Sequence, residues 1–184
     1  MKKLKPKKGR ILISEPNMSD DNFKLAVLII ARHNEQESIG FIINKKTEFT
    51  INDVVEHFPK INANIYIGGP VERNRLYFIH SLGNQIKNSI KISENLYWSG
   101  DFETLKNQIE EGKVKANQIR FFAGYSGWSA GQLEQELDSE TWIVANSDTI
   151  SLDSNEKNMW RNCMKKLEKD YAIWSNMNKD FNLN

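Results

Sequence analysis

The longest apolar run in this 184-residue chain is LAVLIIA, at residues 25–31. A run of this length fits one strand, because a helix that crosses a bilayer needs about 20 apolar residues. Its continuous, β-branched character is typical of a strand that is buried on both faces or covered by a helix. A second apolar run begins at residue 39, after the polar segment RHNEQES. So short a separation indicates an antiparallel hairpin with a longer loop.

Shorter apolar runs predict the remaining strands, and most of them are joined by short loops. These runs lie at residues 11–13, 65–67, 76–80, 90–92, 119–122 and 142–145. Helices are predicted at residues 50–57, 101–111 and 132–137, and around Trp160 and Cys163. Few strand–helix–strand crossovers are present. The pattern therefore predicts an α+β fold, a largely antiparallel curled sheet (a sandwich or partial barrel) with flanking helices.

Charge is distributed unevenly along the chain. The net charge is only +1, yet six of the first ten residues are Lys or Arg. The rest of the chain has 19 basic residues against 24 acidic ones, a balance of −5. We expect a basic, flexible leader at residues 1–9 and a single domain at residues 10–184. Any contact with nucleic acid would be weak and made through this N-terminal tail.

The single cysteine, Cys163, is typical of a protein from a reducing compartment, because it cannot form an internal disulfide. The basic start is not followed by the apolar segment of a secretory signal. We therefore expect a cytoplasmic protein with no membrane partner. The histidines His33, His57 and His80 lack the paired spacing of metal ligands, so neither a metal nor another cofactor is expected.

The segment FAGYSGWSAGQLEQE, at residues 122–136, is the first candidate for chemistry. A serine-hydrolase elbow requires Gly-x-Ser-x-Gly, whereas Trp128 occupies the fifth position here and its indole would crowd the turn. No Gly-Lys-Ser/Thr follows, which argues against a phosphate-binding P-loop. We predict a hard turn instead, shaped by Gly124 and Gly127 and anchored in the core by Tyr125 and Trp128.

Gln132 and Glu136 share one face of the helix predicted after this segment. They could line a ligand site together with Tyr125 and Trp128, or they could simply be solvated. We favour a structural role for the segment, because turns are commoner than ligand-binding loops, but both interpretations stay open.

A second candidate site combines His33, Asn34 and Asn44, which lie at predicted strand ends. If the two longest apolar runs form a hairpin, all three side chains could gather at one sheet edge. The imidazole would supply a base or donor near neutral pH, and the amides could orient a carbonyl or phosphate group. The favoured alternative is that these side chains only cap turns.

Gly68 and Gly69, followed by Pro70, come directly after a predicted strand. Successive backbone N–H groups in such a segment can form an anion-binding nest. A tight exit from the strand is the commoner use of these residues, and we favour it.

Three segments in order resemble the YqgE/AlgH family of bacterial proteins. They are HNEQESIGFIIN, YIGGPVERNRLYFIH and GYSGWSAGQLEQEL, which begin at residues 33, 66 and 124. The similarity extends over nearly the whole chain. The sequence departs from the usual family pattern at Glu37 and Ser38, where Gly and Ala are usual, and at Asn22, where proline is usual. The resemblance implies an α+β sandwich or partial barrel with flanking helices.

The molecular function of this family is largely uncharacterised, and one branch is described as a transcriptional regulator. The resemblance implies a binding or regulatory protein without catalysis, whose partner is an unknown protein or small molecule. An alternative class is an enzyme that acts on a small anionic or carbonyl ligand held by His33, Asn34 and Asn44. A third class is a DNA-binding regulator that uses the basic tail.

Overall fold

The two longest apolar runs form an antiparallel hairpin, as the sequence predicts. A computed structural model describes residues 4–147, 150–152 and 154–167 of the chain. Strand β2 (Val27–His33) pairs with β3 (Glu37–Ile42), and Ile29 lies opposite Phe41. Most side chains of both strands are buried, which explains why neither run shows the alternation of a half-exposed strand.

Ten strands of the described residues form one curled sheet that does not close, and among these strands every pair is antiparallel except β5 and β9. The main path follows the order β10, β1, β2, β3, β9, β6, β8, β7, and β4 pairs with β5 beside it. The remaining strands are β1 (Ile11–Ser14), β4 (Lys46–Thr50), β5 (Asn64–Ile67), β6 (Val71–His80), β7 (Ile90–Lys91), β8 (Tyr97–Trp98), β9 (Ile119–Ser129) and β10 (Trp142–Ala145). This is the α+β, largely antiparallel architecture that the sequence predicts.

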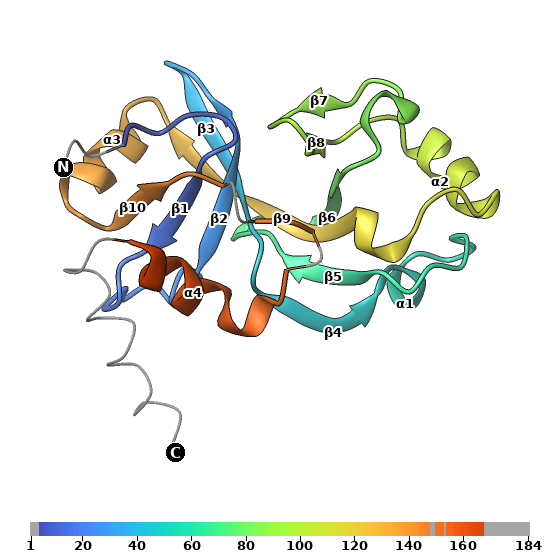
Figure 1. Ribbon diagram of the computed structural model, residues 1–184, viewed down its shortest axis with the longest axis horizontal. Helices are drawn as coiled ribbons and strands as arrows, with labels where there is room; N and C mark the ends of the chain where they lie inside the picture. Colours follow the sequence, from blue (N-terminus) through green and yellow to red (C-terminus); the bar gives the residue numbers. More distant parts are fainter. Residues whose placement is uncertain (1–3, 148–149, 153, 168–184) are drawn as a thin grey trace.

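Strand β9 connects the two halves of the sheet, and in Figure 1 it runs from β5 and β6 on the right to β3 on the left. Up to Tyr125 it pairs with β5 and β6, and from Ser126 to Ser129 it pairs with β3. Gly124, just before the change of partners, has a left-handed φ of 72°. The hard turn predicted at this position is therefore wrong. The glycine bends a continuous strand instead of ending it.

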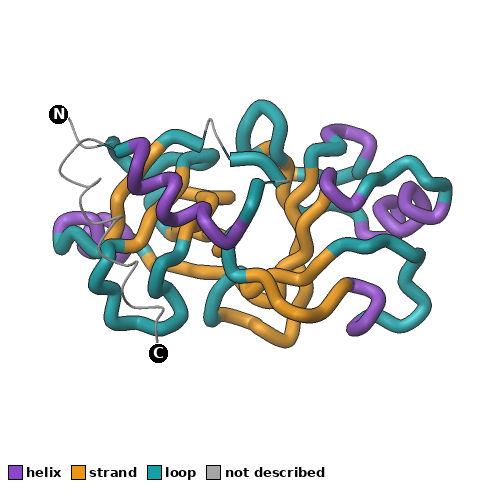
Figure 2. The backbone as a smooth tube through the Cα atoms, turned by 60° about the horizontal axis from the view of Figure 1, so that its bottom comes forward, coloured by secondary structure: helices purple, strands orange, loops and turns teal. Residues whose placement is uncertain are grey.

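Short helices lie outside the sheet, as the tube view in Figure 2 shows. They are α1 (Ile51–Val54), α2 (Phe102–Glu110), α3 (Gln132–Asp138), α4 (Met159–Lys166) and the 3-10 turns η1 (Gly83–Gln85), η2 (Ala116–Gln118) and η3 (Glu156–Asn158). A capping box is present at the start of α1, with the Asp53 carboxylate accepting the Thr50 N–H. No helix in the described ranges is long and apolar enough to cross a bilayer.

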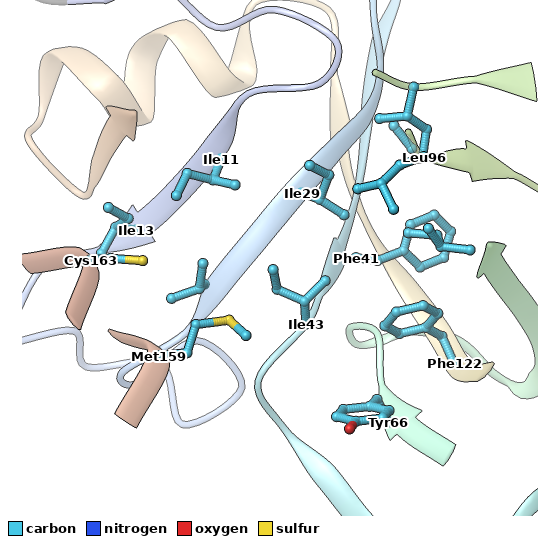
Figure 3. Close-up of a cluster of buried hydrophobic side chains, with 14 of the residues drawn as sticks. Ile11, Ile13, Ile29, Phe41, Ile43, Tyr66, Leu96, Phe122, Met159 and Cys163 are labelled. Carbon is cyan, nitrogen blue, oxygen red and sulfur yellow. The ribbon is translucent and has the colours of Figure 1, made fainter. Parts of the chain in front are cut away.

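Buried apolar side chains form three clusters around the sheet. The first joins β1, β2 and β3 to β6, β8, β9 and α4, and Figure 3 shows its members converging from both halves of the sheet. The second packs α1 and α2 against β5, β6 and β9 around Phe121. The third lies beside α3, around Trp128 and Trp142. The first cluster therefore holds the two halves of the curled sheet together.

Cys163 lies on the buried face of α4, beside the first cluster. Burial raises the pKa of its thiol to about 11, so very little thiolate forms at neutral pH. We expect a thiol reagent to label the native protein on the order of 100-fold more slowly than the denatured chain. Rapid labelling of the folded protein would show that Cys163 lies outside the core.

His80, at the end of β6, is buried and holds the connection to β8 in place. Its Nε2 lies 3.0 Å from Ser89 Oγ and 3.1 Å from Ser99 O, and its Nδ1 accepts the Leu82 N–H at 3.2 Å. The neutral tautomer with hydrogen on Nε2 satisfies both nitrogens. Burial lowers the pKa of His80, and the hydrogen bond to the Ser99 carbonyl partly offsets that effect.

The lowered pKa of His80 should make the protein less stable at acid pH. The unfolded chain, with a histidine pKa of about 6.5, takes up more protons than the folded state as the pH falls below that value. The stabilisation is therefore complete above about pH 6.5 and is lost progressively toward the lower, folded pKa. Urea unfolding at pH 7.5 and 5.5 measures the effect. His80→Gln should be less stable at pH 7.5 but lose less between the two pH values, and an equal loss in both proteins would contradict the assignment.

Candidate functional site

His33 and Asn34 lie at one end of the β2–β3 hairpin and Asn44 lies at the other. The Asn34 Oδ1 accepts the N–H groups of Gln36 and Glu37, at 2.9 and 3.0 Å, within the connecting loop. Asn44 follows β3, and its side chain bonds to the backbone before and at the start of β2. The expected gathering of all three residues at one edge is therefore wrong, because the end of one antiparallel strand meets the beginning of its partner.

The side chain of His33 joins β3 to α3. Its Nδ1 lies 2.8 Å from Ser38 Oγ, and its Nε2 lies 3.6 Å from Glu134 Oε1. Serine, histidine and glutamate in contact have the composition of a hydrolytic triad. Ser38, however, is only 4% exposed. Its hydroxyl therefore orients the imidazole and is poorly placed to attack a substrate.

Glu136 of α3 accepts hydrogen bonds from two indoles and an amide. Its Oε2 accepts the Nε1–H groups of Trp128 and Trp142, at 2.8 and 2.7 Å. Its Oε1 accepts from Gln132 Nε2 at 2.9 Å, and Gln132 Oε1 in turn accepts the Ser129 N–H at 3.0 Å. We call Trp128, Gln132, Glu136 and Trp142 the indole clamp. Three of the residues predicted as possible ligand contacts thus bind one another and fix α3 to the sheet.

Tyr125 and Ser126, side by side in β9, also have structural contacts. Ser126 is fully buried and donates its hydroxyl hydrogen to the Gly68 carbonyl at 3.1 Å. The ring of Tyr125 packs edge-on against Tyr77, with 5.5 Å between the centroids. Burial, with a hydrogen bond to the Glu72 carboxylate, raises the pKa of Tyr77 to about 12. The Tyr77 phenol and the Ser126 hydroxyl are therefore not activated as nucleophiles.

Gly68 and Gly69 form the tight strand exit that the sequence favours. A Cβ on Gly68 would lie 2.2 Å from Gly124 O, and one on Gly69 would lie 2.3 Å from Tyr125 O. The Gly68 N–H donates to Ala123 O at 3.0 Å, so it is not free to bind an anion. The glycines therefore serve the close packing of two backbones.

Lys45 and Arg73 carry no recognisable motif in the sequence, yet they reach the same short loop from different parts of the sheet. The Lys45 ammonium donates to Asp21 O at 2.9 Å. The Arg73 guanidinium donates to Asn22 Oδ1 at 2.5 Å and to Gly69 O at 3.3 Å. No local spacing could reveal this proximity, because residues 51 positions apart are brought together only by the fold.

His, Cys, Asp and Glu side chains do not form a group of three or more able to hold a metal ion, within the ranges that the structure covers. His33 and Glu136, for example, take part in separate contacts instead.

Sequence comparisons connect the chain with bacterial proteins over nearly its full length. The profile of the family described as DUF179, AlgH-like, matches residues 11–172. A UPF0301 protein from Cytophaga hutchinsonii is 42% identical, over 96% of this chain and 98% of its own length. A UPF0301 protein from Parabacteroides distasonis is 40% identical, over 97% of this chain and 92% of its own.

Two solved structures have a similar fold. A crystal structure of a Corynebacterium diphtheriae protein superposes with a TM-score of 0.77 at 24% identity, over 95% of this chain and 94% of that one. The solution structure of the AlgH protein from Pseudomonas aeruginosa superposes with a TM-score of 0.73 at 27% identity, over 96% and 97% of the two chains.

Proposed function

This chain belongs to the AlgH-like family, and from that premise we propose that it is a non-catalytic binding protein with a regulatory role in the cytoplasm. It acts through a small-molecule or protein partner. One observation carries the proposal. Several reactive side chains of this chain are buried or hydrogen-bonded within the fold, whereas two cationic side chains have donors available for a ligand.

Three side chains with nucleophilic or acid–base groups are engaged in holding the fold. Ser126 is buried against a carbonyl, the thiol of Cys163 has a raised pKa, and Glu136 binds two indoles. Lys45 and Arg73, in contrast, have N–H groups that donate to no other described residue. Because these reactive groups are occupied within the fold and the cationic donors are available, the arrangement favours ligand binding over catalysis.

An enzyme that uses His33 is the second candidate, and one observation favours it. The imidazole contacts Ser38 on one side and Glu134 on the other, and its side chain is 20% exposed, so a ligand could reach it. In this role His33 would act as a general base near neutral pH. The buried position of Ser38 places this candidate behind the first.

A thermal-shift screen with nucleotides, small phosphates and small carboxylates separates the two candidates. Under the binding proposal, at least one ligand raises the Tm of the wild type and also that of His33→Ala. Under the enzyme alternative, the substitution abolishes the shift. His33→Ala itself should lower the free energy of unfolding by about 1–2 kcal/mol, because the buried Ser38 hydroxyl loses its partner. A wild type that binds nothing in the screen would count against the binding proposal.

Direct regulation by DNA contact is the less favoured route. The first ten residues carry six basic side chains and no acidic one, whereas the rest of the chain has a balance of −5. DNA binding should therefore be independent of sequence, with a log–log salt slope near −5 if about six phosphates are neutralised. Deleting residues 1–8 should abolish it. Tight binding by the truncated protein at physiological salt would refute this view.

A further inference from the structure

Two cations from separate parts of the sheet converge on the loop at residues 20–22. Lys45 lies between β3 and β4, and Arg73 lies in β6. Their hydrogen bonds reach the consecutive residues Asp21 and Asn22. The positive charge of Arg73 also contributes to the lowered pKa of Lys45, after the larger effect of burial, so the two groups are close enough to repel.

Most of the donors of these two cations have no acceptor among the residues that the structure describes. The ammonium of Lys45 has three N–H bonds and makes one hydrogen bond, and the guanidinium of Arg73 has five and makes two. Neither forms an ion pair with a carboxylate in the part of the chain that the structure describes. The neighbouring cations behave differently, since Lys46 pairs with Glu156 at 3.7 Å and Arg75 pairs with Glu72 at 3.4 Å.

Burial, and not an excess of positive charge, is the main reason for the lowered pKa of Lys45. Asp20 and Asp21 both act to raise the pKa of Lys45, against the larger effect of burial. The Asp20 Oδ1 already accepts the N–H and the Nδ2–H of Asn22, at 2.8 and 2.9 Å. A half-buried ammonium beside a guanidinium is costly to maintain, and an external anion would relieve that cost.

A bulge in β6 brings Arg73 to this position. Between the pairs Val71–Tyr125 and Leu76–Ala123, four residues of β6 face a single residue of β9, which is Gly124. Within the bulge, Glu72 has a left-handed φ of 50°, an unusual conformation for a residue with a side chain. Bulges and strained backbone of this kind recur where a side chain is re-aimed at a binding site.

We propose that Lys45 and Arg73 bind the phosphate group of a small ligand. The planar fork of arginine matches two oxygens of a tetrahedral oxyanion, and lysine adds a compact positive charge beside it. A phosphate fits better than a carboxylate because it offers three oxygens and close to two negative charges. This inference rests on the proposed binding function and specifies the chemistry of the ligand.

Inorganic phosphate and a nucleoside monophosphate, each compared with acetate at constant ionic strength, test the proposal. Calorimetry measures the affinity, and circular dichroism confirms that each variant folds. We expect both phosphates to bind the wild type more tightly than acetate. Lys45→Gln and Arg73→Gln should each weaken phosphate binding about tenfold or more, the loss expected for one charge-assisted contact. Lys45→Arg, which keeps the charge, should retain most of the affinity.

The adjacent residues supply matched controls. Lys46→Gln and Arg75→Gln remove the same charges from cations that already have carboxylate partners, and should leave phosphate binding within about twofold of the wild type. An equal loss of phosphate affinity in all four glutamine variants would mean that the net charge of the protein alone attracts phosphate, and it would overturn the proposed site. No phosphate binding by the wild type would overturn it too. If a different ligand from the screen binds the wild type and Lys45→Gln equally, the proposed binding function survives and this site does not.

Discussion

Replacing Gly124 by alanine should lower the free energy of unfolding by roughly 3–5 kcal/mol. Two penalties combine at this position. The backbone has a φ of 72°, which an L-residue with a side chain adopts at a cost. The new Cβ would also lie 2.5 Å from Val71 O and 2.9 Å from Gly69 O, and both atoms belong to the backbone. Relief would require moving the β6 bulge away from β9.

Two other glycines of the same segment separate these penalties. Gly131 has a similar φ of 74°, but a Cβ added there would have no neighbouring atom within 4 Å, so Gly131→Ala should cost only about 1 kcal/mol. Gly127 lacks a left-handed φ, and its Cβ would meet only the ring of Tyr125, at 3.1 Å. Gly127→Ala should therefore also be mild. Urea unfolding measures the free energy of unfolding of the three variants. Equal losses of stability would show that the close backbone contact at Gly124 does not add to the cost of the substitution.

The strands of the sheet could be predicted because a continuous run of apolar residues indicates a buried strand. The run at residues 25–31 is apolar throughout, and β2 is covered on both faces. The start of a helix can also be predicted from nearby residues. At the start of α2, the Asp101 carboxylate accepts the Thr104 N–H at 3.0 Å. The resemblance to the AlgH-like family rested on longer segments and is confirmed by the comparisons.

The bend in β9 could not be predicted, because it depends on two different neighbours. Glycines usually mark turns, and no local pattern indicates that β6 bulges over Gly124 while β3 pairs with the residues that follow. The helix expected at residues 50–57 is also shorter than predicted. It ends at Val54, and His57 has a left-handed φ of 57° that no α-helix continues.

The common edge expected for His33, Asn34 and Asn44 is wrong for a related reason. All three lie at strand ends, but an antiparallel hairpin separates the two ends of the pair. Lys45 and Arg73 had no local signal at all. Asn34 and Asn44, which have a recognisable sequence context, bind the backbone of the hairpin through their side chains. Lys45 and Arg73 have no such context and come together only through the fold.

Departures from the family pattern have visible consequences in this chain. Glu37 forms an ion pair with Arg32 at 2.7 Å, and Ser38 contacts His33. Gly and Ala, the residues usual there, could make neither contact. Asn22, where proline is usual, supplies the oxygen that holds Arg73.

Replacing Glu136 by alanine should destabilise the protein by about 2–4 kcal/mol, the second large effect that we expect. One carboxylate oxygen accepts the indole N–H groups of both Trp128 and Trp142, which are 4% and 3% exposed. Without it, two buried donors lose their acceptor, and each such loss costs about 1–3 kcal/mol. Part of that cost is recovered if water enters, which is why the expected total is smaller than the sum.

Glu134, two residues earlier on α3, is the matched control for this substitution. Its side chain is 51% exposed and lies 3.6 Å from His33, so Glu134→Ala should change stability by no more than about 0.5 kcal/mol. Glu136→Gln should be intermediate, because an amide oxygen can still accept from the indoles while its NH₂ group faces Gln132. Urea unfolding followed by tryptophan fluorescence measures all three variants. Equal stabilities for the two alanine variants would mean that the indoles find other acceptors, and that α3 is fixed to the sheet by its apolar contacts alone.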